Sequence, residues 1–169
     1  MGTGLDCYKF GRKNNWRRTV WNEAAKRLRD AGKEIKNCTV LYLPGAENED
    51  GRIAIEKGFK PWNLYAVENN ADRVKDLRKN NINVIHGDFV DIIKSWVLKE
   101  KIDFIFADFC GGITKTAERL IIALEFCNGI SERCVVAVNL LRGRDKGIRN
   151  IYESFMSDID SHRGKQFVS

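Results

Sequence analysis

The sequence has few of the residues that build metal sites and disulfide frameworks. It contains two histidines and five cysteines in 169 residues, and the cysteines form no C-x-x-C pair. Structural zinc sites need clustered Cys and His ligands at short spacings, so we expect no metal. An odd number of scattered cysteines fits a reducing cytosol, where most of them would be small buried hydrophobic residues.

Long apolar segments are also absent from the sequence. Apolar runs such as 120–124 and 134–138 are far shorter than the roughly 20 residues that a membrane-spanning helix needs. The first 18 residues show no apolar stretch before a small-residue cleavage site, so we do not expect secretion. A composition of 43% hydrophobic and 31% charged residues is typical of globular proteins, and together these features predict a soluble, cytoplasmic protein.

The positive charge is concentrated near the N-terminus. Residues 1–37 contain ten Lys or Arg and four Asp or Glu, which accounts for the formal net charge of +6 of the whole chain. Basic residues interleaved with aromatic ones can bind phosphates and stack on bases. The alternative is a solvated helix face whose tryptophans pack on the core. We expect 1–37 to be a basic helical segment packed on a cofactor-binding domain at 38–169.

A second basic group follows the last predicted strand and could extend the same surface, although an ordinary exposed loop is the alternative. The candidate nucleic-acid contacts are Arg12, Lys13, Trp16, Arg17, Arg18, Trp21, Arg142 and Arg144.

From residue 39 onward, short apolar segments alternate with helical patterns. The predicted strands are 39–43, 63–69, 82–88, 101–108 and 133–141. Strict alternation of this kind predicts an α/β fold with an open, mostly parallel twisted sheet and helices on both faces. The last two strands are almost continuously apolar, as is typical of strands buried on both sides.

The residues that follow each strand are the candidate ligand contacts, because ligands bind beyond the carboxyl ends of such sheets. The first strand leads into "PGAENEDG", where Gly45 allows close approach of a ligand but three acids crowd the place of a pyrophosphate. Glu68 ends the second strand, about 20 residues after this loop, where an acid can bind ribose hydroxyls. The alternative for Glu68 is a position next to a helix N-cap.

The third and fourth strands also end in an acid followed by an aromatic residue. Gly87, Asp88 and Phe89 could hold an adenine ring, although Asp88 could equally be only the N-cap of the next helix. Asp108 and Phe109 end the fourth strand in the run "DFIFADFCGG".

In this order, the segments "VLYLPGAENEDG", "YAVEN", "VIHGDF" and "FIFADFCGG" resemble the class I S-adenosylmethionine-dependent methyltransferases over about residues 39–141. The resemblance implies S-adenosyl-L-methionine as the cofactor, with the acidic first loop facing its cationic methionine end. The cofactor-binding residues that it implies are Pro44, Gly45, Glu47, Glu68, Asn69, Gly87, Asp88, Phe89 and Asp108.

The chain departs from this family in two respects. The first loop lacks the usual G-x-G-x-G. The family's sheet commonly has seven strands and ends in an antiparallel hairpin, whereas this chain has room for at most the start of a sixth strand. We therefore expect a short or truncated member, or a sheet that a partner chain or a second copy completes.

The proposed reaction centre is Asp108, Phe109 and Cys110. An acid and an aromatic residue after the fourth strand could orient and stack a target amine, as in nucleic-acid amino methyltransferases, although the prolines of D-P-P-Y are missing. Cys110 could be a nucleophile, as in cytosine-C5 methyltransferases, or a small residue in a tight loop. We expect a nucleic-acid methyltransferase; the alternatives are an inactive methyltransferase-like scaffold and, third, an NAD-dependent dehydrogenase.

Overall fold

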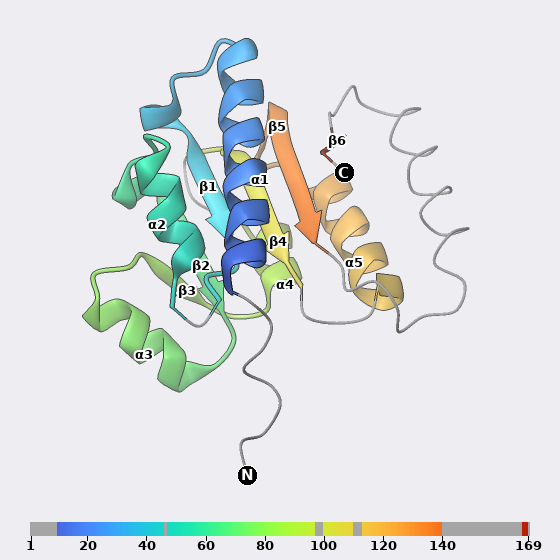
Figure 1. Ribbon diagram of the computed structural model, residues 1–169. Coiled ribbons are helices and arrows are strands. Elements are labelled where there is room, and N and C mark those ends of the chain that lie inside the picture. Colours follow the sequence, from blue (N-terminus) through green and yellow to red (C-terminus); the bar gives the residue numbers. More distant parts are fainter. Residues whose placement is uncertain (1–9, 46, 97–99, 110–112, 140–166, 169) are drawn as a thin grey trace.

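The structure is a computed structural model, and it describes residues 10–45, 47–96, 100–109, 113–139 and 167–168 (Figure 1). The strands are β1 (Thr39–Tyr42), β2 (Leu64–Glu68), β3 (Val84–His86), β4 (Ile102–Asp108), β5 (Ile130–Asn139) and β6 (Phe167–Val168). The helices are α1 (Phe10–Asp30), α2 (Glu49–Glu56), α3 (Ala71–Lys79), α4 (Phe89–Lys94) and α5 (Ile113–Phe126), with short 3-10 turns at Ile35–Asn37 and Pro61–Asn63. The helix expected after residue 141 lies outside the described residues.

The strands form one sheet in the order β3-β2-β1-β4-β5-β6, and every pair of neighbours is parallel. The chain therefore moves outward from β1 to β3 and then crosses to β4 on the other side of β1. The carboxyl ends of β1 and β4 mark the point at which the strand order reverses, which is where such sheets bind ligands. The predicted fold class is confirmed, and the short sixth strand pairs parallel to β5.

Helices cover both faces of the sheet. Helices α1, α2 and α3 lie on one face, and α4 and α5 lie on the other (Figure 1). Within the described residues, no cluster of three or more His, Cys, Asp or Glu side chains could hold a metal ion. None of the helices in that part of the chain has the length and apolar character to cross a bilayer.

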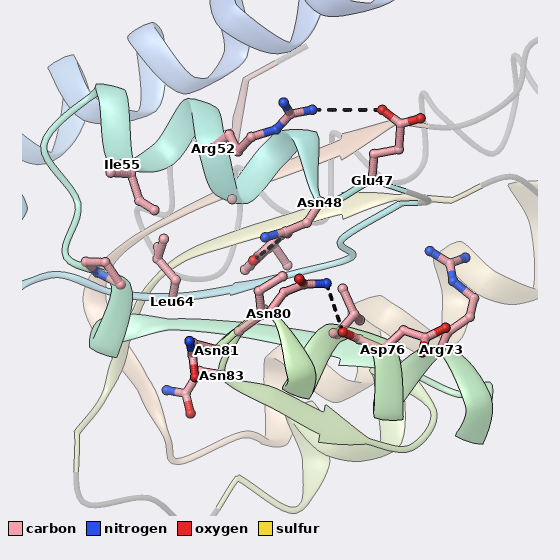
Figure 2. Close-up of a pocket in the computed structure, with 15 residues that line it drawn as sticks. Glu47, Asn48, Arg52, Ile55, Leu64, Arg73, Asp76, Asn80, Asn81 and Asn83 are labelled. Atoms are coloured by element: carbon pink, nitrogen blue, oxygen red, sulfur yellow. Dashed lines mark hydrogen bonds and ion pairs between the residues drawn. The ribbon is translucent and has the colours of Figure 1, made fainter.

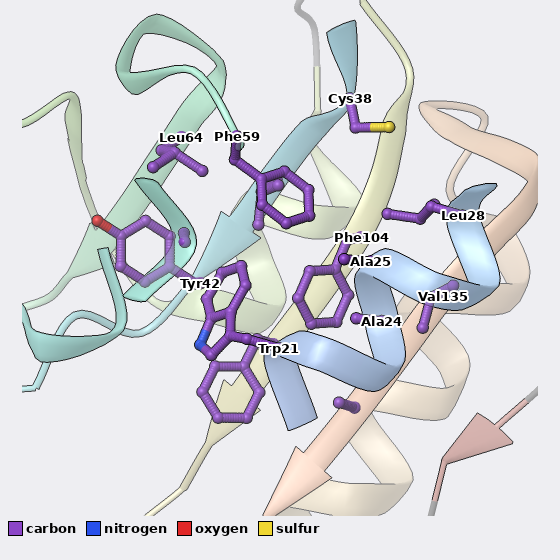
Figure 3. Packing of buried hydrophobic residues seen from close by; sticks show 14 of the residues in the cluster. Trp21, Ala24, Ala25, Leu28, Cys38, Tyr42, Phe59, Leu64, Phe104 and Val135 are labelled. Carbon is purple, nitrogen blue, oxygen red and sulfur yellow. The ribbon is translucent and has the colours of Figure 1, made fainter. Parts of the chain in front are cut away.

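The face that α1 covers has an aromatic core centred on Trp21. The Trp21 ring is fully buried and makes edge-to-face contacts with Phe104, Phe59 and Tyr42, with ring centroids 4.9, 5.6 and 6.3 Å apart (Figure 3). Such aromatic pairs contribute roughly 0.5–1.5 kcal/mol each beyond the burial of area. The expectation that Trp21 stacks on nucleic-acid bases is wrong, because its side chain holds α1 to the sheet.

The opposite face has a mainly aliphatic core. Ile93 of α4 and Leu120 and Ala123 of α5 are buried against Leu41 and Ile105 of the central strands. The two cores fix the central strands from both sides, so the loops at their carboxyl ends are supported by a rigid frame.

Candidate active site

A cavity of about 330 Å³, called the crevice below, lies at the carboxyl ends of the strands. This volume is at the lower end of the range of about 300–1,000 Å³ that is usual for small-molecule sites. Eight of the nine predicted cofactor residues line it, together with Phe109: Pro44, Gly45, Glu68, Asn69, Gly87, Asp88, Phe89 and Asp108. The fold thus brings together residues that are separated by more than sixty positions in the sequence.

Glu47 is the predicted cofactor residue that does not line the crevice. Its side chain is 74% exposed and lies 3.9 Å from the Arg52 guanidinium, on the side of a different cavity. The placement of Glu47 beneath the cofactor is therefore wrong in this structure, since the first loop carries it away toward α2.

Glu68 ends β2 with its carboxylate turned into the crevice and almost buried. One carboxylate oxygen accepts a hydrogen bond from the Asn70 backbone N–H at 2.9 Å, and the other lies 3.4 Å from Nε of Arg73. Arg73 also donates to the carbonyl oxygen of Gly45. It therefore ties the first loop to the acid that follows β2.

Asp88 follows β3 and is the N-cap of α4, as its position in the sequence allowed. Its Oδ1 accepts hydrogen bonds from the backbone N–H groups of Val90 at 3.0 Å and Asp91 at 3.2 Å, and from Arg119 of α5 at 3.1 Å. Its Oδ2 has no partner among the residues that the structure describes. Asp88 thus combines a structural cap with a carboxylate oxygen that can accept a hydrogen bond from a ligand.

Asp108 ends β4 at the centre of a buried polar network. Its Oδ2 lies 3.2 Å from Nη2 of Arg17, and its Oδ1 accepts a 2.7 Å hydrogen bond from Asn139 of β5. Nε of Arg17 lies 3.2 Å from Asp50, whose other carboxylate oxygen accepts a hydrogen bond from Trp21 Nε1 at 3.1 Å. Arg17 therefore links α1, the first turn of α2 and the end of β4.

All three strand-end acids share one arrangement. Each is paired with an arginine, and the three arginines come from three different helices, α3, α5 and α1. The crevice is consequently not an acidic pocket, because these guanidinium groups offset its carboxylates. Each pairing also fixes the orientation of an acid at the end of its strand.

The walls between these acids suit a flat, partly apolar ligand. Phe89 and Phe109 meet edge to face, with their ring centroids 5.8 Å apart, and Val67 and Leu43 add aliphatic surface. Gly45 has a φ of +62°, a left-handed conformation that favours glycine, and a Cβ there would lie 3.6 Å from Nη2 of Arg17. The first loop can thus bring its backbone close to a ligand.

Sequence reasoning missed the residues that complete the crevice, chiefly Arg73 and Arg119. Arg73 lies in the first turn of the helix after Glu68, and this short spacing was a usable signal. Arg119 is 31 positions from Asp88, and nothing in the sequence indicates their contact. Leu43, Val67 and Val90 flank predicted residues but have no chemistry that distinguishes them.

On α1, the predicted nucleic-acid contacts whose side chains the structure describes make contacts within the protein. Arg17 is directed inward to Asp50 and Asp108, and Trp16 packs against Phe106 with ring centroids 5.9 Å apart. Arg18 forms a surface ion pair with Glu56. The role predicted for Arg17 is therefore wrong, because its side chain is only 12% exposed and is held by two carboxylates.

Other predicted residues lie outside the description. These are Cys110, Arg142 and Arg144, together with the side chains of Arg12 and Lys13. Their predicted roles stay predictions.

Comparison with solved structures identifies the fold. No protein-family model matches the chain, and no curated protein matches it in sequence. Among solved structures, one that resembles it is a protein of Haemophilus influenzae with the provisional name of methylase, at a TM-score of 0.56 and 16% identity, over 79% of this chain and 82% of that one. The chain has the fold of a class I methyltransferase.

A more distant solved structure is an S-adenosylmethionine-dependent methyltransferase of Archaeoglobus fulgidus. It is 18% identical, with a TM-score of 0.43, over 65% of this chain and 48% of the other. This likeness is too weak to carry an argument. In the methyltransferase fold, the crevice of this chain lies at the reversal of strand order between β1 and β4.

Proposed function

We propose that the protein is an S-adenosyl-L-methionine-dependent methyltransferase that acts on nucleic acid. The observation that carries the proposal is the crevice, in which the acids after β2, β3 and β4 line one cavity in a methyltransferase fold. Its size, its aromatic wall and its hydrogen-bond acceptors all suit an adenosine group.

The residues present fit the adenosine part of this cofactor. Glu68 lies where its carboxylate would accept hydrogen bonds from ribose hydroxyl groups, in competition with Arg73. Asp88 Oδ2 is available to accept a hydrogen bond from an adenine amino group, and Phe89 and Phe109 supply an apolar surface for the ring. The bound cofactor would supply an electrophilic methyl group.

Asp108 would act on the methyl acceptor. Arg17 and Asn139 hold its carboxylate in one orientation in the wall of the crevice. A carboxylate fixed there can orient a target amine, and positioning is the main contribution that an enzyme makes to a displacement of this kind. Phe109, the next residue, would contribute an edge or face for packing against a base.

The support for nucleic acid as the substrate comes from the positive charge of the N-terminal segment and not from the crevice. Residues 1–37 carry the whole formal net charge of +6, and a positive segment next to an active site attracts a polyanion. The correction of Trp21 and Arg17 removes two of the side chains on which this prediction rested. The surface that holds the substrate would therefore have to use other residues.

A second candidate is a methyltransferase-like scaffold without activity. The ion pairs of Glu68 with Arg73 and of Asp108 with Arg17 favour it, because both acids already have cationic partners. An active enzyme would have to share or open these pairs when its ligands bind.

Transfer of a tritium-labelled methyl group from the cofactor to RNA, single-stranded DNA and duplex DNA tests the proposal. We expect labelling of one of these acceptors by the wild type, loss of labelling in Asp108→Ala, and no change in the control Glu34→Ala, which removes an exposed acid that does not line the crevice. Absence of labelling from all three acceptors, in a sample that binds the cofactor, would favour the scaffold.

A further inference from the structure

A second cavity of about 600 Å³ lies between α2 and α3 on the α1 side of the sheet (Figure 2). It is larger than the crevice and shares only Arg73 with it. We call it the groove, and we propose that it binds a nucleobase. This inference does not depend on methyl transfer.

The groove is unusually rich in side-chain amides. Asn48, Asn80, Asn81 and Asn83 all line it, and Figure 2 shows Asn48 and Asn80 between the two helices, with Asn81 and Asn83 beside the end of α3. An amide offers a donor and an acceptor side by side, which matches the edge of a base; such bidentate contacts are the usual way in which Asn reads adenine. Four amides around one cavity thus supply the hydrogen-bonding groups that a heterocycle needs.

In three of these four amides, one polar atom makes a hydrogen bond within the protein. Asn48 Oδ1 accepts from the Tyr42 hydroxyl at 2.8 Å, Asn80 Nδ2 donates to the Asp76 carbonyl at 3.0 Å, and Asn83 Nδ2 donates to the Trp62 carbonyl at 3.3 Å. These hydrogen bonds hold the amide groups in place. Within the described part of the chain, the amino group of Asn48 and the oxygens of Asn80 and Asn83 have no hydrogen-bond partner, so they are available to a ligand.

The apolar part of the groove can hold the faces of a ring. Leu64, Leu77 and Ile55 contribute aliphatic surface, and Ile55 is 49% exposed despite its size. Trp62 follows Pro61, which lines the groove, and its side chain is 65% exposed. The Trp62 ring does not itself line the groove, and Lys60 Nζ lies 5.8 Å from its centroid. In the proposal, this exposed ring is the face on which a base that extends from the groove would stack.

The charges of the groove favour a neutral ring over a phosphate. Its charged side chains are two arginines, Arg52 and Arg73, and two acids, Glu47 and Asp76, so their signs cancel. Arg52 is paired with Glu49, and Arg73 with Glu68. A free nucleoside and an unpaired base of a single strand both supply the required chemistry.

The test is a titration with uncharged ribonucleosides, followed by NMR of the side-chain amide groups. The crevice is first saturated with S-adenosylhomocysteine, so that adenosine cannot be detected there instead. Guanosine, cytidine, uridine and adenosine are then added in turn, and a short single-stranded oligonucleotide is added in a parallel sample. We expect the amide signals of the groove asparagines to shift with at least one of these probes.

Two variants locate the binding. Asn81→Gly removes an amide and tolerates the left-handed φ of +56° at this position, and Trp62→Ala removes the exposed ring. Each should weaken binding of the probe at least fivefold. Asn22→Ala, which removes an exposed amide from α1, is the matched control and should leave binding unchanged.

The outcomes separate the two possible sources of the base. Shifts with nucleosides indicate a small-molecule site, and shifts with the oligonucleotide alone indicate a nucleic-acid strand. Absence of groove shifts with every probe, or binding that Asn81→Gly and Trp62→Ala leave unchanged, would overturn the inference. Binding of S-adenosylhomocysteine is monitored separately by the amide of Asn69 in the crevice, so a failure of the proposed function would not be mistaken for a failure of the groove.

Discussion

The two ends of the crevice carry the same ion pair in opposite surroundings. Asp108 lies 3.2 Å from Arg17 and Asp88 lies 3.1 Å from Arg119, so the distances are almost equal. The first pair is nearly buried, with side chains 6% and 12% exposed, whereas the second is about half exposed, at 46% and 48%. Burial, rather than distance, therefore decides what each pair contributes.

The difference matters for both stability and function. Breaking a buried pair leaves a charge without compensation in a poorly solvated site, whereas water replaces the partner of an exposed charge. The buried end also contains Asp50, which is fully buried and shares Arg17 with Asp108. We infer that the Asp108 end is a fixed frame and that the Asp88 end can rearrange around a ligand.

The largest effect should come from Arg17→Ala. This change leaves Asp50 and Asp108 without their guanidinium partner, and loss of one member of a buried pair typically costs about 3–5 kcal/mol in the free energy of unfolding. Urea denaturation of the wild type and variant measures it. The matched change at the exposed end, Arg119→Ala, should cost no more than about 1 kcal/mol. Equal losses in the two variants would contradict the comparison.

A smaller effect should appear at alkaline pH through Tyr42, which lies near Asp50. Burial of the Tyr42 hydroxyl raises its pKa, and the negative charge of Asp50 raises it further. In the unfolded chain the phenol ionises near its usual value of about 10, so the unfolded state binds fewer protons above that pH and is favoured. The contribution of Tyr42 to the free energy of unfolding should be fully present below pH 10 and decrease above it.

The corresponding measurement is the free energy of unfolding at pH 9 and pH 11. Tyr42→Phe should remove roughly 1 kcal/mol of the decrease that the wild type shows between these two values. Wild type and variant curves that decrease in parallel would show that Tyr42 does not titrate as its burial requires.

The smallest effect should separate the two roles of Asp88. Asp88→Ala removes both the N-cap of α4 and the contact with Arg119, and loss of a cap costs about 1 kcal/mol. Asp88→Asn keeps a side chain that caps equally well and loses only the charge, so its cost should be less than half as large. Thermal unfolding of both variants makes the comparison, and equal costs would show that the exposed ion pair matters more than the cap.

Much of the fold could be predicted from the sequence, because alternating strands and helices admit few arrangements. The crevice followed from the same reasoning: the ends of parallel strands gather at one edge, so Glu68, Asp88 and Asp108 had to lie near one another. These residues are defined by position along a strand, which is a local property. Local properties are what a single sequence shows directly.

The rest depended on contacts between distant elements. Arg17 and Trp21 have the composition of a nucleic-acid surface, and only the docking of α1 on the sheet shows that both are directed inward. The pairing of Arg119 with Asp88 likewise requires the packing of α5 beside α4. The groove exists because α2 and α3 leave space between them, and no residue pattern indicates such a space.

The most direct test of the central claim is calorimetric titration of the purified protein with S-adenosyl-L-methionine, beside Glu68→Ala. The account predicts micromolar binding by the wild type and binding at least tenfold weaker in the variant, with both samples equally folded. The absence of binding in a well-folded wild-type sample, or equal affinity in Glu68→Ala, would contradict the assignment of the crevice as the cofactor site.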